Sequence, residues 1–257
     1  MKIAIAGYGY VGKAVHGAAK RWHQTMVIDP GYEEFENNKI DDTYEGLIIC
    51  VSTPEADDGS CDMTNVIDVI QTTPKKIPIL IKSTISMEGW LQINADFPNH
   101  YICFSPEFLR AETALEDFKN QDVMYISLEK SGSHEHWEQV FKGCLNNRNY
   151  VFKNAEELIL AKYFRNSFLA TKVSFFNQVY DLCKAKDIDF EAVREVIADD
   201  KRIGHGHSMV TEQRGFGGHC FPKDTSAIVE TAKNDNVDLT LIEEAIKYNA
   251  TIRKPNK

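Results

Sequence analysis

With 257 residues, 43% of them hydrophobic, the chain is long enough for one large domain or two small ones. A formal charge of -9 and a pI near 5.4 exclude the basic surface that a nucleic-acid partner needs. The absence of both a long apolar run and a signal-peptide pattern predicts a cytoplasmic protein without a membrane partner.

The N-terminal residues have the pattern of a strand, a glycine turn and a helix. An apolar run at 2–6 is followed by Gly7-Tyr8-Gly9-Tyr10-Val11-Gly12 and then by apolar residues at helical spacing. In this pattern the first glycine makes the tight turn, the second admits a pyrophosphate, and the third lets the helix pack on its strand. We expect the cofactor at Gly7, Gly9, Tyr10, Val11 and Gly12, with the pyrophosphate at the helix N-terminus.

Asp29 follows a second strand-like run at 25–28. An acidic residue at this place can bind both ribose hydroxyls and repels a 2′-phosphate, so the expected cofactor is NAD. The alternative is that Asp29, Pro30 and Gly31 only form the turn that ends the strand.

Strand-like and helical patterns then alternate. The predicted strands lie at 46–51, 77–82, 101–104 and 123–127, and the predicted helices at 64–73, 87–95, 111–118 and 134–145. Alternation predicts an α/β fold, a Rossmann-type doubly wound and mostly parallel sheet with helices on both faces. We assign this NAD-binding domain to residues 1–153.

Polar residues follow three of the predicted strands. Thr53, the pair Ser83-Thr84 and the segment Ser105-Pro106-Glu107 fall at strand ends, where parallel sheets bind ligands. These side chains could line one crevice. The alternative is that they only end strands and begin loops.

Residues 154–257 predict a smaller, all-helical domain built on one long helix. The stretch 154–186 contains no glycine or proline, Asn154 suits its N-cap, and its length corresponds to roughly 45 Å. Its many phenylalanines give it more apolar surface than one helix of a monomer usually needs, so we expect a homodimer. Lys162 and Asn166 share one face of this helix, either as a site or as a solvated stripe.

The loop 199–218 contains five glycines and several basic residues, Arg202 among them, and precedes Cys220. A long loop at this place favours substrate binding. Pro222 suits the first turn of a helix, so Cys220 would lie at a positive helix end, where Lys223 and His219 also favour a thiolate. The alternative is a buried structural cysteine. The final helix is expected at 239–252.

The six cysteines are scattered, which indicates reduced thiols and neither a disulfide framework nor a zinc cluster. The pairs His134/His136 and His205/His207 have the spacing of metal ligands but lack a third ligand nearby. We therefore predict no bound metal.

Taken together, these motifs resemble the UDP-glucose/GDP-mannose dehydrogenase family, the nucleotide-sugar dehydrogenases. The resemblance rests on motifs in family order: residues 7–12, Val51-Ser52-Thr53-Pro54, Lys82-Ser83-Thr84, Ser105-Pro106-Glu107-Phe108-Leu109-Arg110, Lys162 with Asn166, and Gly217-Gly218-His219-Cys220-Phe221-Pro222-Lys223-Asp224. It implies oxidation of a sugar C6 alcohol to a carboxylate with two NAD and a Cys220 thioester.

The resemblance also implies a role for each matching residue. Lys162 and Asp224 would stabilise the oxyanion and position water, and Asn166 would hold the sugar or the oxyanion. Glu107 and Thr84 would order water and substrate. The cofactor contacts would include Thr53, Thr84 and Lys223, and the substrate contacts Glu107, Phe108, Leu109, Arg110, Lys162, Asn166, Arg202 and Gly217.

The sequence departs from the family pattern in three respects. The family has a further C-terminal domain that holds the nucleotide, Ala111 stands where a second glutamate is common, and Ser86-Met87-Glu88-Gly89 replaces the usual continuation after Thr84. Two alternatives therefore stay open. One is a dehydrogenase that makes a single hydride transfer to oxidise a sugar phosphate or hydroxyacid, and the other is a degenerate NAD-binding partner of a full-length homologue.

Overall fold

The computed structural model describes residues 1–56, 60–129, 131–218 and 220–254. The chain folds into two compact units. The first contains residues 1–56 and 61–162, and the main part of the second begins at Tyr163. The division falls inside helix α6 (Ala155–Ala185), so that one helix belongs to both units, whereas the expected domain boundary at 153/154 precedes this helix.

The first unit contains a five-stranded parallel sheet in the order β2-β1-β3-β4-β5. These strands are β1 (Lys2–Ala6), β2 (Gln24–Ile28), β3 (Gly46–Ile49), β4 (Ile79–Ile81) and β5 (Ile102–Phe104). A two-stranded parallel sheet pairs β6 (Met124–Ser127) with β7 (Tyr150–Lys153). The predicted parallel α/β fold is confirmed.

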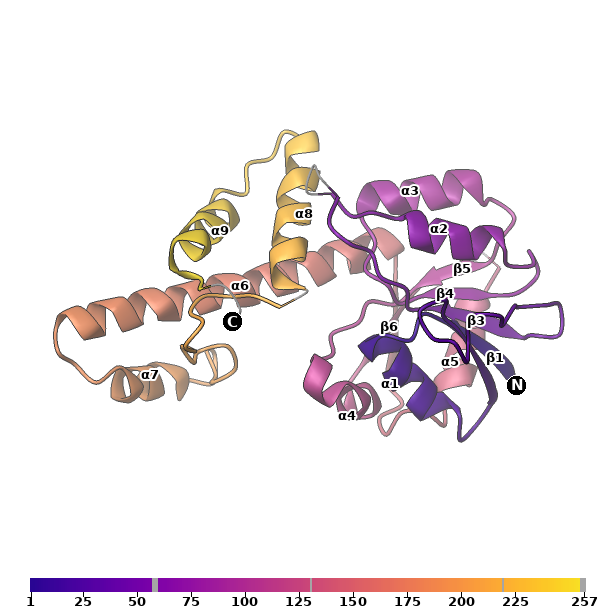
Figure 1. Cartoon of the computed structure of the whole chain (residues 1–257), viewed down its shortest axis with the longest axis horizontal. Helices are drawn as coiled ribbons and strands as arrows, with labels where there is room; N and C mark the ends of the chain where they lie inside the picture. The colour runs from indigo at the N-terminus through magenta and orange to yellow at the C-terminus, as the bar shows by residue number, and fades with distance from the viewer. Residues whose placement is uncertain (57–59, 130, 219, 255–257) are drawn as a thin grey trace. The chain divides into compact units, whose positions relative to one another are not determined.

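Helices cover both faces of this sheet. Figure 1 shows α2 (Thr64–Gln71) and α3 (Met87–Asp96) on one face, and α1 (Tyr10–Ala19), α4 (Ala114–Asn120) and α5 (Ser133–Phe141) on the other. A short 3₁₀ turn, η1 (Ala111–Thr113), precedes α4. The apolar strands are buried between the two helical layers, with Ile3, Ile48 and Leu80 fully inaccessible. Burial on both faces explains why these strands are continuously apolar.

The second unit is all-helical, as predicted. It comprises most of α6, with α7 (Phe190–Ala198), α8 (Phe221–Asn234) and α9 (Thr240–Ile252). The long helix ends where Asp187 adopts a left-handed φ of 55° and Ile188 N–H donates to the carbonyl of Cys183 at 2.9 Å. This is a C-terminal cap of the kind that normally uses glycine.

Helix α7 was not among the predicted elements. Asp189 caps it by accepting the N–H of Glu191 at 2.9 Å, and Phe190 belongs to an apolar cluster with Phe176 and Cys183 of α6. A helix of nine residues gains most of its stability from such packing. That packing cannot be read from a short local pattern.

None of the helices in the described ranges combines the length and the apolar character that a transmembrane span requires.

The turn between β1 and α1 requires a glycine at position 7. Its φ is +92°, and an added Cβ would lie 2.6 Å from the carbonyl carbon and oxygen of Cys50. We expect Gly7→Ala to destabilise the protein by about 1–3 kcal/mol, since it combines backbone strain with a clash. Gly9→Ala is the matched control, because Gly9 has a negative φ of -68° and no atom within 4 Å of the added Cβ. Equal unfolding midpoints for the two variants in urea would contradict this explanation.

Candidate functional site

The glycine turn and Asp29 lie against each other at the carboxyl ends of β1 and β2. Oδ2 of Asp29 accepts the Tyr8 N–H at 2.6 Å, and Oδ1 accepts the Gly31 N–H at 2.8 Å. The Gly7 N–H donates to the carbonyl of Ile28 at 2.8 Å. A carboxylate is thus fixed beside the turn from which α1 begins, within reach of a nucleotide that lies on that turn.

Aromatic side chains surround this end of the sheet. The Tyr8 ring lies edge-on to Tyr32 and Phe35, with centroid distances of 5.4 and 5.0 Å. The Lys13 ammonium lies 5.4 Å from the Tyr8 centroid and 5.3 Å from that of Tyr32. The sequence patterns did not single out this cluster. The only available signal was the number of aromatic residues close to the glycine motif and to Asp29.

The strand order changes direction between β1 and β3, which is where ligands bind in sheets of this kind. Thr53, after β3, is buried, and Thr84, after β4, is half-buried. The hydroxyl of Ser83 donates to the carbonyl of Val51 at 2.7 Å and ties these two strand ends together. The predicted polar residues therefore gather at one edge of the sheet.

Glu107 follows β5 and is only 6% exposed. It is the most buried carboxylate among the predicted site residues of the first unit. Its Oε2 lies 2.9 Å from Nζ of Lys82, and its main-chain carbonyl accepts Nζ of Lys162 at 2.6 Å. Lys162 is itself only 5% exposed, so it does not belong to a solvated stripe of the helix. Sequence reasoning quoted Lys82 only as part of a motif, although a charge at the end of a buried strand was a usable signal.

The residues after Glu107 become progressively more exposed. Phe108 and Leu109 are half-buried and Arg110 is exposed. The guanidinium of Arg110 forms two bonds to Asp117, Nη2 to Oδ1 at 2.6 Å and Nε to Oδ2 at 3.0 Å. Hydrogen bonds from Arg110 hold the pKa of Asp117 well below its usual range. In this structure the Arg110 side chain therefore stabilises the start of α4.

In the second unit, Cys220 occupies the N-cap position of α8, with Pro222 in the first turn. The chain just before it bends at Gly218, whose φ is +78°. Cys220 is half-buried, whereas the other five cysteines are buried. A thiol at this end of a helix experiences the positive end of the dipole. His219 lies outside the described residues.

Asp224 is the organising carboxylate of this unit and is fully buried. Its Oδ2 accepts the side-chain amide of Asn166 at 2.6 Å, and its Oδ1 accepts Nζ of Lys223 at 2.5 Å. A buried carboxylate with two such donors is fixed in position. Three predicted site residues thus form one hydrogen-bonded group, in which Asp224 lies one turn after Cys220 on α8.

Two residues predicted to bind substrate have other partners in this unit. Arg202 is exposed and is bonded to the carboxylate of Asp200, with its Nε at 3.0 Å from Oδ1. Gly217 packs beneath Arg253, and an added Cβ would lie 2.4 Å from Nη2 of that arginine. The substrate-binding role of Arg202 and Gly217 stays a prediction.

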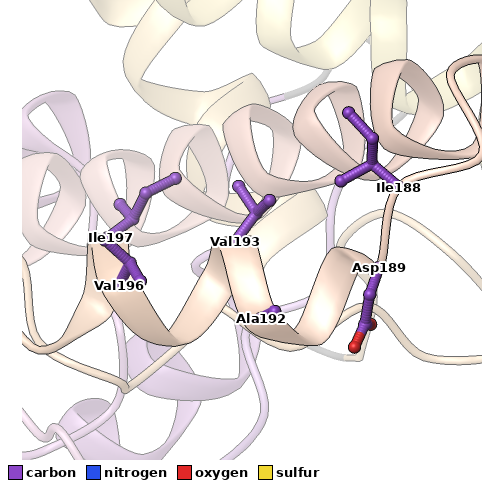
Figure 2. A pocket seen from close by; sticks show the side chains of 6 residues that line it. All are labelled: Ile188, Asp189, Ala192, Val193, Val196 and Ile197. Atoms are coloured by element: carbon purple, nitrogen blue, oxygen red, sulfur yellow. The ribbon is translucent and has the colours of Figure 1, made fainter.

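Metal ligands do not cluster in the described ranges, where no group of three His, Cys, Asp or Glu side chains could hold an ion. The second unit does contain an apolar groove of about 350 Å³ along α7, lined by Ile188, Asp189, Ala192, Val193, Val196 and Ile197 (Figure 2). Exposed phenylalanines on α6, Phe168 and Phe175 among them, add further apolar surface to this unit.

Burial separates Cys220 from the other five cysteines. Burial raises the pKa of Cys50 and of Cys103 to about 12 and that of Cys144 to about 11. A raised pKa keeps these thiols protonated at every pH well below it, so at pH 8 they react slowly. We expect iodoacetamide to label Cys220 first, as read by peptide mass spectrometry of the folded protein. Labelling of Cys50 before Cys220 would contradict the structure.

Both units of the chain match known protein families. The model of the NAD binding domain of the UDP-glucose/GDP-mannose dehydrogenase family matches residues 33–145, and the model of the central domain of the same family matches residues 154–251. The chain belongs to the UDP-glucose/GDP-mannose dehydrogenase family. The expected cofactor, NAD, is confirmed by the first of these domains.

Individual relatives give the same result. A UDP-glucose 6-dehydrogenase of Rickettsia felis is 31% identical over 222 residues, which cover 83% of this chain and 49% of that protein. UDP-glucose 6-dehydrogenase YwqF of Bacillus subtilis is 28% identical over a match that covers 97% of this chain and 66% of that protein. The structure of a UDP-glucose dehydrogenase from Pyrobaculum islandicum superposes with a TM-score of 0.83 at 26% identity, over 97% and 68% of the two chains. This family member thus spans about half to two-thirds of its relatives' length.

Proposed function

We propose that this protein oxidises the primary alcohol of a nucleotide sugar to a carboxylate, with UDP-glucose as the first candidate substrate. The observation that carries the proposal is Cys220 at the start of α8, one turn before the buried Asp224, whose carboxylate accepts hydrogen bonds from Asn166 and Lys223. A thiol with a fixed carboxylate near it suits covalent catalysis on an aldehyde. The names of the relatives motivate the choice of substrate.

In the proposed reaction NAD, when bound, accepts a hydride in each of two oxidation steps. The Cys220 thiolate forms a bond to the aldehyde carbon left by the first oxidation, which gives a thiohemiacetal. The second oxidation converts this adduct into a thioester, and water then breaks the carbon–sulfur bond to release the acid and the thiol. The two oxidations together remove four electrons from the sugar. Each NAD accepts two of them, so the reaction needs two NAD.

The other residues of the proposed site assist Cys220. The Lys162 ammonium would stabilise the oxyanion on the reacting carbon, and Asn166, held by Asp224, would orient the sugar or that oxyanion. Asp224 would position the hydrolytic water. The glycine turn and Asp29 would bind the NAD, whose hydride-accepting ring the residues around Thr53 and Thr84 would help to orient.

The experiment that tests this proposal is a screen of UDP- and GDP-sugars, sugar phosphates and hydroxyacids for NADH release. UDP-glucose should give NADH, and its acid should appear as product. NADH release from a sugar phosphate or a hydroxyacid alone would favour the single-hydride alternative. Saturable NAD binding without NADH release from any of these substrates would favour the NAD-binding partner.

We further propose a homodimer that buries the apolar surface of α6 and α7, in a cytoplasmic enzyme supplied with NAD. Phe168 is 69% exposed and Val196 is 79% exposed. Such exposed apolar side chains on neighbouring helices suit an interface between protein chains. Phe168→Asp should convert a dimer into a monomer in light scattering. Leu91→Asp, on the exposed face of α3 at 60% exposure, should leave the dimer intact. A monomeric wild-type protein would contradict this proposal.

A further inference from the structure

The chain reaches Cys220 through a strained turn that the proposed reaction does not explain. Arg214 and Gly215 both have a left-handed backbone, with φ of 59° and 54°. A glycine adopts this conformation freely, whereas an arginine does so at a cost. A strained backbone persists only where the surrounding structure holds it, and strain of this kind clusters at functional sites. The groups that hold this turn therefore indicate what it does.

Two asparagine side chains bind the main chain of the turn. Oδ1 of Asn249, on α9, accepts the Phe216 N–H at 2.7 Å, and Nδ2 of the same side chain donates to the Phe216 carbonyl at 3.1 Å. Oδ1 of Asn177, on α6, accepts the Gly215 N–H at 3.2 Å. One amide thus satisfies both main-chain groups of Phe216, while the other holds the residue before it.

Helix α6 also fixes the side chain of Arg214. Its Nε donates to Oδ1 of Asn177 at 2.7 Å, and its Nη2 donates to Oδ1 of Asp181 at 2.7 Å. The guanidinium lies 4.7 Å from the centroid of the Tyr180 ring. Oδ1 of Asn177 therefore joins the side chain of Arg214 to the main chain of Gly215.

Phe216 ends the turn and anchors it in the core of the second unit. Its side chain is 4% exposed and packs with Ala170 and Val173 of α6. Only three residues separate Phe216 from Cys220, which lies at the start of α8. Because so short a segment spans at most about 14 Å, the place of Phe216 limits where the thiol can lie.

We propose that Asn177 and Asn249 are positioning residues, whose side-chain amides fix the turn at 214–216 and thereby place Cys220 for its attack on the aldehyde. The inference rests on the proposed function, in which this thiol is the nucleophile. In this role neither amide contacts the substrate. The two amides hold a costly backbone conformation, because bond formation requires the sulfur at the correct distance and direction from the carbon.

Leucine has nearly the shape of asparagine but no polar group, so Asn177→Leu and Asn249→Leu test the two amides. Each variant should lower kcat by about 100-fold, since a misplaced nucleophile loses the geometry that the reaction needs. KM for NAD should change by less than about twofold, because the proposed cofactor site lies in the first unit. Asn177→Asp keeps the acceptor for Arg214 and for the Gly215 N–H, so its kcat should stay within about fivefold of the wild-type value.

Ile242→Ala is the control for lost stability, because Ile242 is a buried apolar residue of α9, two turns before Asn249. It should lower the unfolding midpoint and leave kcat unchanged. Wild-type kcat in either folded leucine variant overturns the inference. An Asn177→Asp variant as slow as Asn177→Leu also overturns it, since the hydrogen bonds to Arg214 and Gly215 would then not be what places the thiol.

Hydrogen exchange tests the turn without turnover and with a milder variant, Asn249→Ala. The shorter side chain lets water reach Phe216, so the Phe216 amide should exchange at least about tenfold faster than in the wild-type protein. Mass spectrometry of peptides from this turn measures the rate, and an unchanged rate overturns the inference. A wild-type protein without turnover on any nucleotide sugar removes the proposed function, whereas hydrogen exchange still decides whether Asn249 fixes the turn.

Discussion

Cys220→Ser should abolish formation of the sugar acid while NAD binding persists. Serine keeps nearly the shape of the side chain, but its hydroxyl is a far weaker nucleophile than a thiolate, and oxidation of its hemiacetal would give an ester. Loss of a catalytic nucleophile typically lowers kcat by about 1,000-fold or more. The measurement is acid production with UDP-glucose and NAD, with NAD binding followed by calorimetry.

Cys183→Ser is the matched control for this variant, because Cys183 is a buried cysteine of the same unit that packs with Phe176 and Phe190. It should retain acid formation and lose only some stability. Acid production by Cys220→Ser at the wild-type rate would contradict a covalent role for this thiol.

Lys162→Met should lower kcat by about 100-fold or more, with little change in the affinity for NAD. The ammonium is buried and held by the carbonyl of Glu107 at 2.6 Å, so it has a fixed position from which to stabilise an oxyanion. Removing one such donor from an active site costs about 100- to 1,000-fold in kcat. Methionine keeps the length of the side chain and removes only the charge and the donors.

The control is Lys184→Met, which changes an exposed lysine near the other end of the same helix. It should leave kcat unchanged. If Lys162→Met raises KM for the sugar and leaves kcat unaltered, Lys162 binds the ground state and does not stabilise the transition state.

The fold was largely predictable because its signals are local. Continuous apolar runs such as 46–49 need two covered faces, and glycines at 7 and 12 are needed where an added Cβ would meet the backbone of Cys50 or of Gly7. Absence of glycine and proline sufficed for α6. Helix α7 was not predicted, because its nine residues depend on packing against Phe176.

The site was predictable as a set of residues but not as a set of contacts. Spacing places Lys162 and Asn166 on one helix face, yet it does not reveal that one binds the carbonyl of Glu107 and the other the carboxylate of Asp224. These partners are 55 and 58 residues away in the sequence. The ion pair of Lys82 with Glu107 was not predictable for the same reason, since the two residues meet only in the tertiary fold.

The most direct test of the proposed function is the ratio of NADH to sugar acid produced from UDP-glucose. A covalent Cys220 route carries each substrate through two oxidations, so it predicts two NADH for every acid and no free aldehyde in solution. One NADH per substrate molecule, with an aldehyde or ketone accumulating, would contradict it.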